Sequence, residues 1–307
     1  MEMSRFVLKR CLEFVPVLFI IITLVFFMIR LAPGGPFDAE KSVSPAVRKN
    51  LEAHYNMDAP LLRQYTHYIN RLLHGDLGPS FKKQNRSVNE WIALRFPVSL
   101  ELGAYGILVA LAIGLTAGVI ASLRPNTWSD HLPMSMAMIG ICVPNFVLGP
   151  LLVLVFSLKL GWLNVSGWHA PADKVLPALT LGAAYAAYIA RLSRAGMLEI
   201  LNQDFIRTAR AKGLSETRVI LRHALRGGIK PVVAFLGPAI AGLLSGSFVV
   251  ETIFDVPGLG REFVQAAFNR DYTMIMGTVL FYAALIMVLN LLVDVAQVWL
   301  DPRLRHA

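Results

Sequence analysis

The residues of this chain that are best suited to chemistry are basic side chains gathered in one segment. Residues 207–228, RTARAKGLSETRVILRHALRGG, include five arginines and one lysine, and long apolar runs lie on both sides. Charge of this kind can attract nucleic acid, anionic lipid or a partner protein. The position of the segment between two apolar runs decides which of these three partners it can reach.

Motifs for covalent chemistry are absent from the sequence. It contains no GxxxxGK[ST] phosphate loop, no HExxH, no GxSxG and no CxxC. The segment from Gly258 to Gly260 begins like a dinucleotide fingerprint, but alanines follow it and no strand precedes it. Three histidines of one polar stretch, His54, His67 and His74, lack metal-pair spacing and cysteine neighbours. We therefore expect neither an enzyme nor a metal site.

Long apolar runs position the basic segment. The chain has 307 residues, of which 55% are hydrophobic and 16% charged, whereas soluble domains carry about 25% charged residues. Six runs are long enough to be predicted as membrane-spanning helices. The second, third, fifth and sixth contain no charged residue, the first carries one glutamate, and the fourth is short. The six runs are 11–29, 102–123, 132–158, 175–190, 231–250 and 272–293.

The distribution of lysine and arginine predicts the orientation. With the N-terminus in the cytoplasm, fifteen basic residues fall on the cytoplasmic side and four in the short external loops. The excess follows the positive-inside rule and places both termini and the basic segment in the cytoplasm. The net charge of +9 then reports topology, so we expect no nucleic-acid partner. The first run has no small-residue cleavage site after it and is interpreted as an uncleaved signal-anchor.

The segment between the first two runs is external, polar and too long for a plain connector. We predict short helices at Val47–His54 and Leu61–Leu73, and interpret the segment as functional or as a small cap. The expected division of the chain is 1–31 for the N-terminal tail and first helix, 32–98 for the periplasmic loop region, and 99–307 for a five-helix core. The core would include a cytoplasmic loop at about 198–228.

Few polar residues interrupt the apolar runs. Asp294 directly follows the sixth run and lies near the cytoplasmic interface, so no acidic relay is placed at the midplane. If the protein moves a solute uphill, we expect the energy to enter from another chain. GxxxG patterns at 114–118 and 242–246 allow close helix contact. The sequence leaves open whether they pack within this chain or against a second membrane subunit.

The basic segment is predicted to fold as two short helices joined by a turn. Asp204 is a suitable N-cap for a helix beginning at Phe205, and Gly213 is a suitable end for it. Ser215 can cap a second helix that runs to Arg226, where two glycines follow.

Both helices have apolar residues at helical spacing. On the first, Phe205, Ile206 and Ala209 fall on one face, while Arg207 and Arg210 fall elsewhere. The second can lie against the membrane bundle through three residues: Val219, Ile220 and Leu225. Two interpretations stay open at this point: a helix in the membrane interface attracted to anionic lipid, and a helix that docks into the groove of a soluble partner.

The segment Arg207-Thr208-Ala209, with Gly213 four residues later, resembles the EAA-type loop of ABC-importer permeases. It departs from the general form at Arg207-Thr208, which replace Glu-Ala, and at Arg226, which replaces a proline. TARAKGL is usual in the peptide and nickel branch of that family. Other stretches resemble the same branch: DAP at 58–60, QY at 64–65, GDLGPS at 75–80, ETIFDVPGLG at 251–260 and DPR at 301–303. RLAPGGPF at 30–37 with GPSFK at 78–82 is similar to the B-type subunit of oligopeptide permeases.

The resemblance implies an all-α type I importer permease with six transmembrane helices in the bacterial inner membrane. It would form half of the translocation pathway for oligopeptides. Its implied partners are a homologous second permease, two cytoplasmic ATPases, a periplasmic peptide-binding protein and membrane lipid. ATP and magnesium would be bound by the ATPases, and no cofactor by this chain. The alternatives are a permease for dipeptides, nickel or glutathione in the same family, or an ion-coupled secondary transporter.

The resemblance also implies two functional sites. The loop that couples to an ATPase would consist of Phe205, Ile206, Arg207, Thr208, Ala209, Arg210, Lys212 and Gly213. A periplasmic gating motif would consist of Phe254, Pro257, Gly258 and Gly260.

Overall fold

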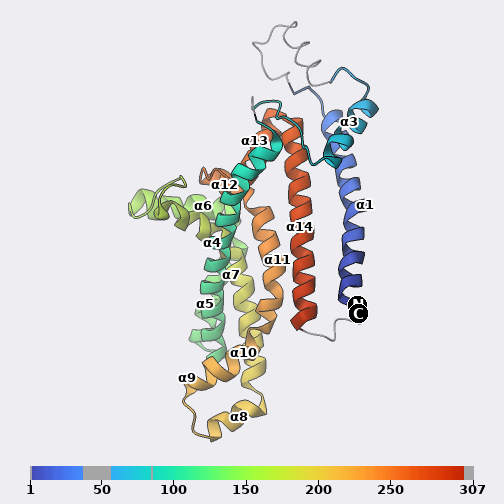
Figure 1. Cartoon of the computed structure of the whole chain (residues 1–307). Helices are drawn as coiled ribbons and strands as arrows, with labels where there is room; N and C mark the ends of the chain where they lie inside the picture. Colours follow the sequence, from blue (N-terminus) through green and yellow to red (C-terminus); the bar gives the residue numbers. More distant parts are fainter. Residues whose placement is uncertain (1, 37–56, 84–85, 301–307) are drawn as a thin grey trace. The chain divides into compact units, whose positions relative to one another are not determined.

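The computed structural model describes residues 2–36, 57–83 and 86–300, and every regular element in these ranges is a helix (Figure 1). The chain divides into two compact units, of which the first is Met1–Val98 with Gly258–Leu291 and the second is Ser99–Pro257 with Leu292–Ala307. Residues 258–291 thus associate with the N-terminal part, whereas the sequence-based division assigned them to the 99–307 core. The helix predicted at 47–54 and the DPR stretch at 301–303 lie outside the described residues.

Within the described residues, the first unit consists of three whole helices and parts of two others. They are α1 (Glu2–Leu31), α3 (Leu61–Leu73), α13 (Leu259–Asn269), the start of α4 (Val88–Leu123) and most of α14 (Tyr272–Leu300). The prediction of a helix at 61–73 is confirmed. One apolar cluster joins α1, α3 and α14 through Phe26, Tyr68 and Met276. A second joins α4, α13 and α14 through Val88, Leu259 and Met274, so this unit has its own core.

The second unit is organised around α7 (Pro171–Leu201), which contacts most of the other helices of the unit. Its neighbours include α4, through Gly114 and Gly118, and the helices α5 (Trp128–Cys142) and α11 (Lys230–Gly246). The short helices α6 (Asn145–Leu152) and α12 (Phe248–Ile253) also contact it. Because α7 is surrounded, even its polar residues Thr180 and Ser193 are fully buried.

The small residues of the apolar runs bring helices together within this chain. A β-carbon at Gly114 would lie 2.6 Å from the carbonyl oxygen of Ala186, and one at Gly118 would lie 2.5 Å from that of Ala190. A β-carbon at Gly242 would lie 2.3 Å from the hydroxyl of Tyr185. The contacts of Gly114 and Gly118 are with backbone atoms, which cannot move aside as the Tyr185 side chain can, so these two positions require glycine. Of the two interpretations left open by the sequence, packing inside the chain is the one observed at these three glycines.

The apolar run at 132–158, which was predicted to cross the membrane as a helix, is not one continuous helix. It comprises α5, then α6 with the π-helix η1 (Val153–Lys159), and the two parts meet at an angle of 112°. The break lies at Val143, which is extended with ψ of 116°. Pro144 explains it, because a proline disfavours the helical region for the residue before it and has no N–H to donate.

Five helices of the described residues are long and apolar enough to cross a membrane, and the bent pair can make a sixth. The fourth predicted run is longer than the sequence indicated, since α7 continues through Arg191 and Arg194 to Leu201. Arg194 is neutralised there by Asp130 of α5, whose carboxylate accepts bonds of 2.6 and 2.5 Å from the guanidinium. A paired charge can remain inside a helix bundle where an isolated one would end the span.

Candidate functional site

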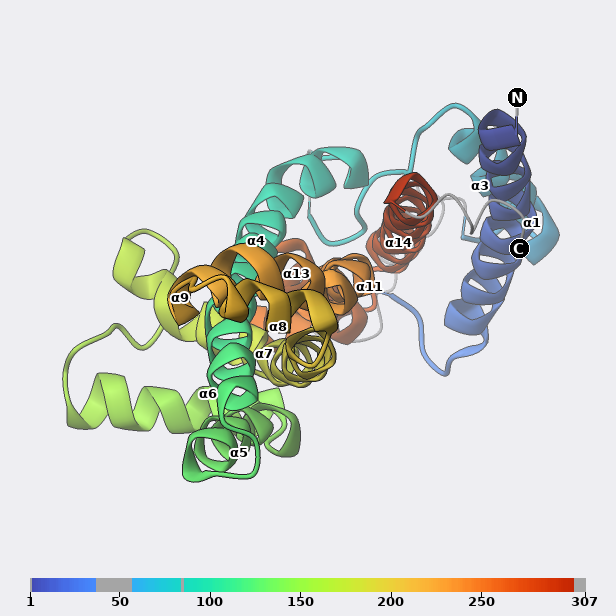
Figure 2. The ribbon, with the colours of Figure 1, turned by 90° about the horizontal axis from the view of Figure 1, so that it is seen from below.

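The basic segment folds as predicted into two helical arms joined by a turn. The first arm is α8 (Asp204–Ala211); the second consists of α9 (Glu216–Arg218), the π-helix η2 (Val219–Ala224) and α10 (Leu225–Gly228). Seen from below, α8 runs across the end of α7 (Figure 2). The predicted N-cap is wrong by one residue, because Gln203 holds that position and Asp204 is the first helical residue. An acidic residue in a first turn still stabilises the helix through its dipole.

Gly213 ends the first arm, as the sequence predicted. Its φ is +77°, a left-handed conformation that costs a residue with a β-carbon about 1–2 kcal/mol. The N–H of Gly213 donates to Arg210 O at 2.9 Å, and the N–H of Leu214 donates to Ala209 O at 3.4 Å. These two bonds make a Schellman motif, which satisfies the last carbonyls of α8. Gly213 therefore sets the direction in which the second arm leaves.

Apolar side chains hold the two arms on the end of α7. Ile206 is fully buried and Ala209 is buried, in a cluster with Met197 of α7 and with Val219 and Ala224 of η2. Partly buried side chains, Ile220 and Leu225 among them, pack against this cluster. The expectation that Val219, Ile220 and Leu225 lie against the bundle is therefore confirmed.

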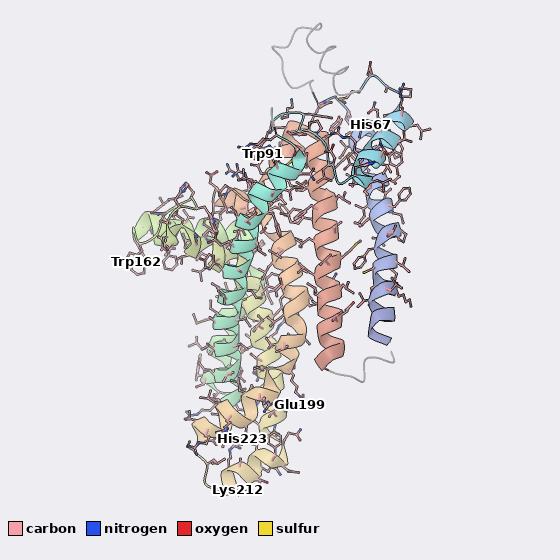
Figure 3. The ribbon with its side chains drawn as sticks, in the orientation of Figure 1. His67, Trp91, Trp162, Glu199, Lys212 and His223 are labelled. Atoms are coloured by element: carbon pink, nitrogen blue, oxygen red, sulfur yellow. The ribbon has the colours of Figure 1, made fainter. Side chains whose placement is uncertain are left out.

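The predicted apolar face of α8 needs one correction. Phe205 was expected beside Ile206 and Ala209, but half of its surface is exposed. The reason is geometric: Ile206 and Ala209 are three residues apart and face α7, whereas Phe205 lies about 100° around the helix from Ile206. Six of the eight predicted coupling residues are therefore exposed: Phe205, Arg207, Thr208, Arg210, Lys212 and Gly213. Lys212 lies at the outer turn (Figure 3).

Two ion pairs stiffen the exposed surface of the loop. Arg210 donates from Nε to Glu216 Oε1 at 2.7 Å and so joins the two arms across the Gly213 turn. Arg207 lies 3.5 Å from Asp204 within the first arm. Both pairs are exposed, so each contributes under about 1 kcal/mol. The arginines are thus oriented by neighbours while remaining accessible.

The end predicted for the second arm is not observed. The helix continues through Gly227 and Gly228 and turns only at Ile229, immediately before α11. The glycines serve close packing, because a β-carbon at Gly228 would lie 2.6 Å from Met197 Sδ, and one at Gly196 would lie 2.2 Å from the carbonyl oxygen of Gly228. This contact fastens the arm to α7.

Of the four predicted gating residues, Phe254, Gly258 and Gly260 are buried and Pro257 is partly buried. Phe254 is 1% exposed, and a β-carbon at Gly149 of α6 would touch its ring at 3.2 Å. The carbonyl of Phe254 accepts a bond from the N–H of Gly167. Gly258 precedes α13, and Gly260 is buried within it. The part of these residues in gating stays a prediction.

Sequence reasoning did not single out three buried acids. The first two, Glu251 and Asp130, belong to the second unit. Glu251 is fully buried and accepts a 2.6 Å bond from the hydroxyl of Ser247, a pair whose spacing of four residues could have been noticed. Asp130 pairs with Arg194, which is 64 residues away, so the sequence around Asp130 does not predict this pair.

The third missed acid, Asp271, belongs to an external network of the first unit. It is 2% exposed and accepts bonds from the hydroxyl of Ser80, from the N–H of Phe81 at 3.1 Å and from the hydroxyl of Thr273 at 3.1 Å. Nearby, Glu262 of α13 pairs with Lys83 and with Arg95. The GDLGPS stretch therefore ends in a loop that is fastened by buried carboxylates.

No metal centre is found in the described ranges, since no three of their His, Cys, Asp and Glu side chains lie close enough to hold an ion. Of the three histidines that lack metal-pair spacing, His67 and His74 are exposed, and His54 is outside those ranges. His67 lies on α3 (Figure 3).

Comparison with known proteins gives matches over nearly the whole chain. The model of the binding-protein-dependent transport system inner membrane component matches residues 114–306, and the model of its N-terminal part matches residues 3–103. The chain is 48% identical to the oligopeptide transport system permease protein OppB of Salmonella typhimurium over 99% of this chain and 100% of that protein.

Relatives with other printed substrates are similar over the same length. The dipeptide transport system permease protein DppB of Bacillus subtilis is 44% identical, over 99% of this chain and 98% of its own length. The glutathione transport system permease protein GsiC of Escherichia coli is 42% identical, over 99% of this chain and 100% of its own length.

Two solved structures share the fold. One is an amino acid ABC transporter, with a TM-score of 0.52 and 17% identity over 67% of this chain and 92% of that chain. The other is an inward-facing methionine ABC transporter, with a TM-score of 0.52 and 18% identity over 67% of this chain and 95% of that chain.

Proposed function

The chain belongs to the family of binding-protein-dependent transport system inner membrane components, and from this membership we propose that it is the permease subunit of an ATP-driven oligopeptide importer. The observation that carries the substrate class is the full-length identity of 48% to an oligopeptide permease. Dipeptides are the second candidate, because the dipeptide relative is 44% identical. In this proposal the chain forms half of the translocation pathway and catalyses no covalent reaction.

The proposed assembly contains four kinds of partner: a second homologous permease, two cytoplasmic ATPases, a periplasmic binding protein and the peptide. ATP and magnesium would be bound by the ATPases and no cofactor by this chain. This arrangement is supported by the absence of a phosphate-binding motif from the full sequence. It is also consistent with the lack of an acidic relay in the apolar runs.

We assign the ATPase contact to the exposed side of α8. Phe205 offers an accessible aromatic ring, and Arg207 and Lys212 offer positive charge around it. Aromatic and arginine side chains are the commonest anchors of protein interfaces. The inner side of the same loop is fastened to α7 through Ile206 and Met197. A displacement of α8 by the ATPase would therefore move α7 with it, as a rigid element rather than as a flexible linker.

The docking role is tested by Phe205→Ala. Loss of an aromatic anchor weakens an interface by about 2 kcal/mol, or roughly thirtyfold in affinity. We expect the ATPases to co-purify poorly with the variant and peptide uptake to fall in proportion. Thr217→Ala, at an exposed position of α9, is the matched control and should change neither. Full co-purification of the Phe205 variant would exclude this side chain as an anchor.

The substrate class is tested in cells that lack the gene and carry it on a plasmid. We expect the plasmid to restore uptake of labelled peptides that are longer than dipeptides. Uptake of dipeptides alone would favour the second candidate. Peptide flux through the purified chain alone in liposomes, driven by an ion gradient, would contradict an ATP-driven importer.

A further inference from the structure

The first unit contains a polar cavity of about 940 Å³ at the external end of α1. Its walls come from the end of α1, from α3 and from the loop at 77–81. A cavity of this size is large enough for a small ligand. Its lining includes Arg30, Arg63, Arg71 and His67 but a single acidic residue, Asp58. The cavity is therefore suited to a negatively charged group.

Arg30 is the central residue of this cavity. Its guanidinium lies 3.6 Å above the ring of Phe26, its Nε donates to Gln64 Oε1 at 3.0 Å, and its Nη1 is 3.7 Å from Met276 Sδ. No carboxylate pairs with Arg30 in the described ranges. A largely buried cation without an anion is costly, and a guanidinium has five N–H donors. Most of the donors of Arg30 are thus left for a ligand.

A second buried group in the cavity lining lacks a partner. The hydroxyl of Tyr68 is buried and forms no hydrogen bond, and the residue is 8% exposed. Burial raises the pKa of Tyr68 to about 12, against the opposing effect of the Arg30 charge. The phenol is therefore protonated at physiological pH and can donate. An unsatisfied buried donor costs about 1–3 kcal/mol, which a ligand that accepts a bond would recover.

The position of the cavity relative to the membrane favours one class of anionic ligand. Arg30 directly follows the uncharged residues that end the first apolar run, so it lies where a membrane-spanning helix reaches the lipid headgroups. The side of α1 that ends at Arg30 carries exposed apolar side chains, Leu24, Met28 and Leu31 among them. A cationic cavity beside an exposed apolar helix face matches a molecule with an anionic head and a hydrocarbon tail.

We propose that this cavity binds the phosphate of an anionic phospholipid, with Arg30 and Tyr68 as the hydrogen-bond donors and the acyl chains along the exposed apolar face of α1. The accessible guanidinium of Arg63 favours a headgroup with net negative charge over a zwitterionic one. The acidic side chain of a partner protein would satisfy Arg30, but it would leave this apolar face uncovered. The inference does not depend on the identity of the transported solute.

The test is native mass spectrometry of the full chain purified in detergent and titrated with phosphatidylglycerol or phosphatidylcholine. We expect tighter binding of phosphatidylglycerol and a loss of about tenfold or more in its affinity for Arg30→Gln, because hydrogen bonds to charged groups are worth about 1.5–3 kcal/mol. Tyr68→Phe should lower the affinity several-fold without lowering thermal stability, since the hydroxyl has no partner in the protein. Arg86→Gln, at an exposed external arginine, is the control and should bind normally.

Three results would overturn the proposal. Equal phosphatidylglycerol affinity of the wild type and a folded Tyr68→Phe variant would exclude the assigned donor, even if Arg30→Gln failed to fold. Competition by inorganic phosphate at the concentration of the lipid would indicate a small-anion site instead. Displacement of the lipid by an acidic peptide at equal concentration would indicate a docking site for a protein.

Discussion

The cytoplasmic loop at 204–228 and the external loop at 75–83 are both polar segments next to apolar helices, but they are held in opposite ways. The cytoplasmic loop has an apolar centre around Ile206 and carries its charges outside. The external loop is fastened by carboxylates that are buried, Asp271 and Glu262. In the first case charge is available to another molecule, and in the second it is used inside the protein.

This difference separates a basic surface that can bind from a polar network that stabilises. Exposed ion pairs such as Arg210–Glu216 contribute little to stability because water screens them. A buried carboxylate with several donors contributes more, because its removal leaves those donors unsatisfied. The net charge of a segment is therefore a poor guide to its role, and the burial of its charges is a better one.

The largest effect is expected for Asp271→Ala, which should lower the free energy of unfolding by about 3 kcal/mol, because the hydroxyl of Ser80 and the N–H of Phe81 lose their acceptor. SDS titration of the purified chain in mixed micelles measures it. Asp271→Asn keeps one acceptor oxygen and should cost about half as much. Asp204→Ala in the cytoplasmic loop, where the carboxylate is 96% exposed, should cost under about 0.5 kcal/mol. Equal losses at Asp271 and Asp204 would remove the distinction between the two loops.

An intermediate effect is expected for Gly213→Val. A β-carbon at Gly213 meets no atom within 4 Å, so the cost is conformational, about 1–2 kcal/mol for the left-handed backbone. We expect the protein to reach the membrane at a normal level while peptide uptake is lost. Immunoblots of membranes and uptake assays measure the two quantities. Gly213→Asn, which tolerates this conformation, should keep most of the uptake. Normal uptake by the valine variant would argue against a coupling role for the turn.

The smallest effect is expected for Arg210→Gln, which breaks the bond between the two arms. Because the pair is exposed, the loss of stability should be under about 1 kcal/mol. Thermal unfolding of the purified chain measures it, and the exchanged pair Arg210→Glu with Glu216→Arg should restore the wild-type value. A loss above about 2 kcal/mol would mean that the loop depends on its charges as much as the external one does.

Features with a local cause were predictable. The helix at 61–73 was found as a stretch free of proline after Pro60, and the end of α8 was found from the conformational freedom of Gly213. The direction of Phe205 and the position of the α8 N-cap were not, because each depends on how α8 contacts α7. Pro144 is a local signal for the bend after α5, but the run was predicted as one span because it is apolar throughout.

The sequence by itself determined that the chain is helical, crosses a membrane and has its basic segment at 207–228 on the cytoplasmic side. Apolar run length, charge asymmetry and glycine position act within a few residues and need no knowledge of the fold. Only the tertiary structure decided which glycines meet which helices, that Asp130 pairs with Arg194, and that Arg30 and Tyr68 meet in one cavity. Each of these joins residues far apart in the chain, and such contacts depend on the packing of whole helices.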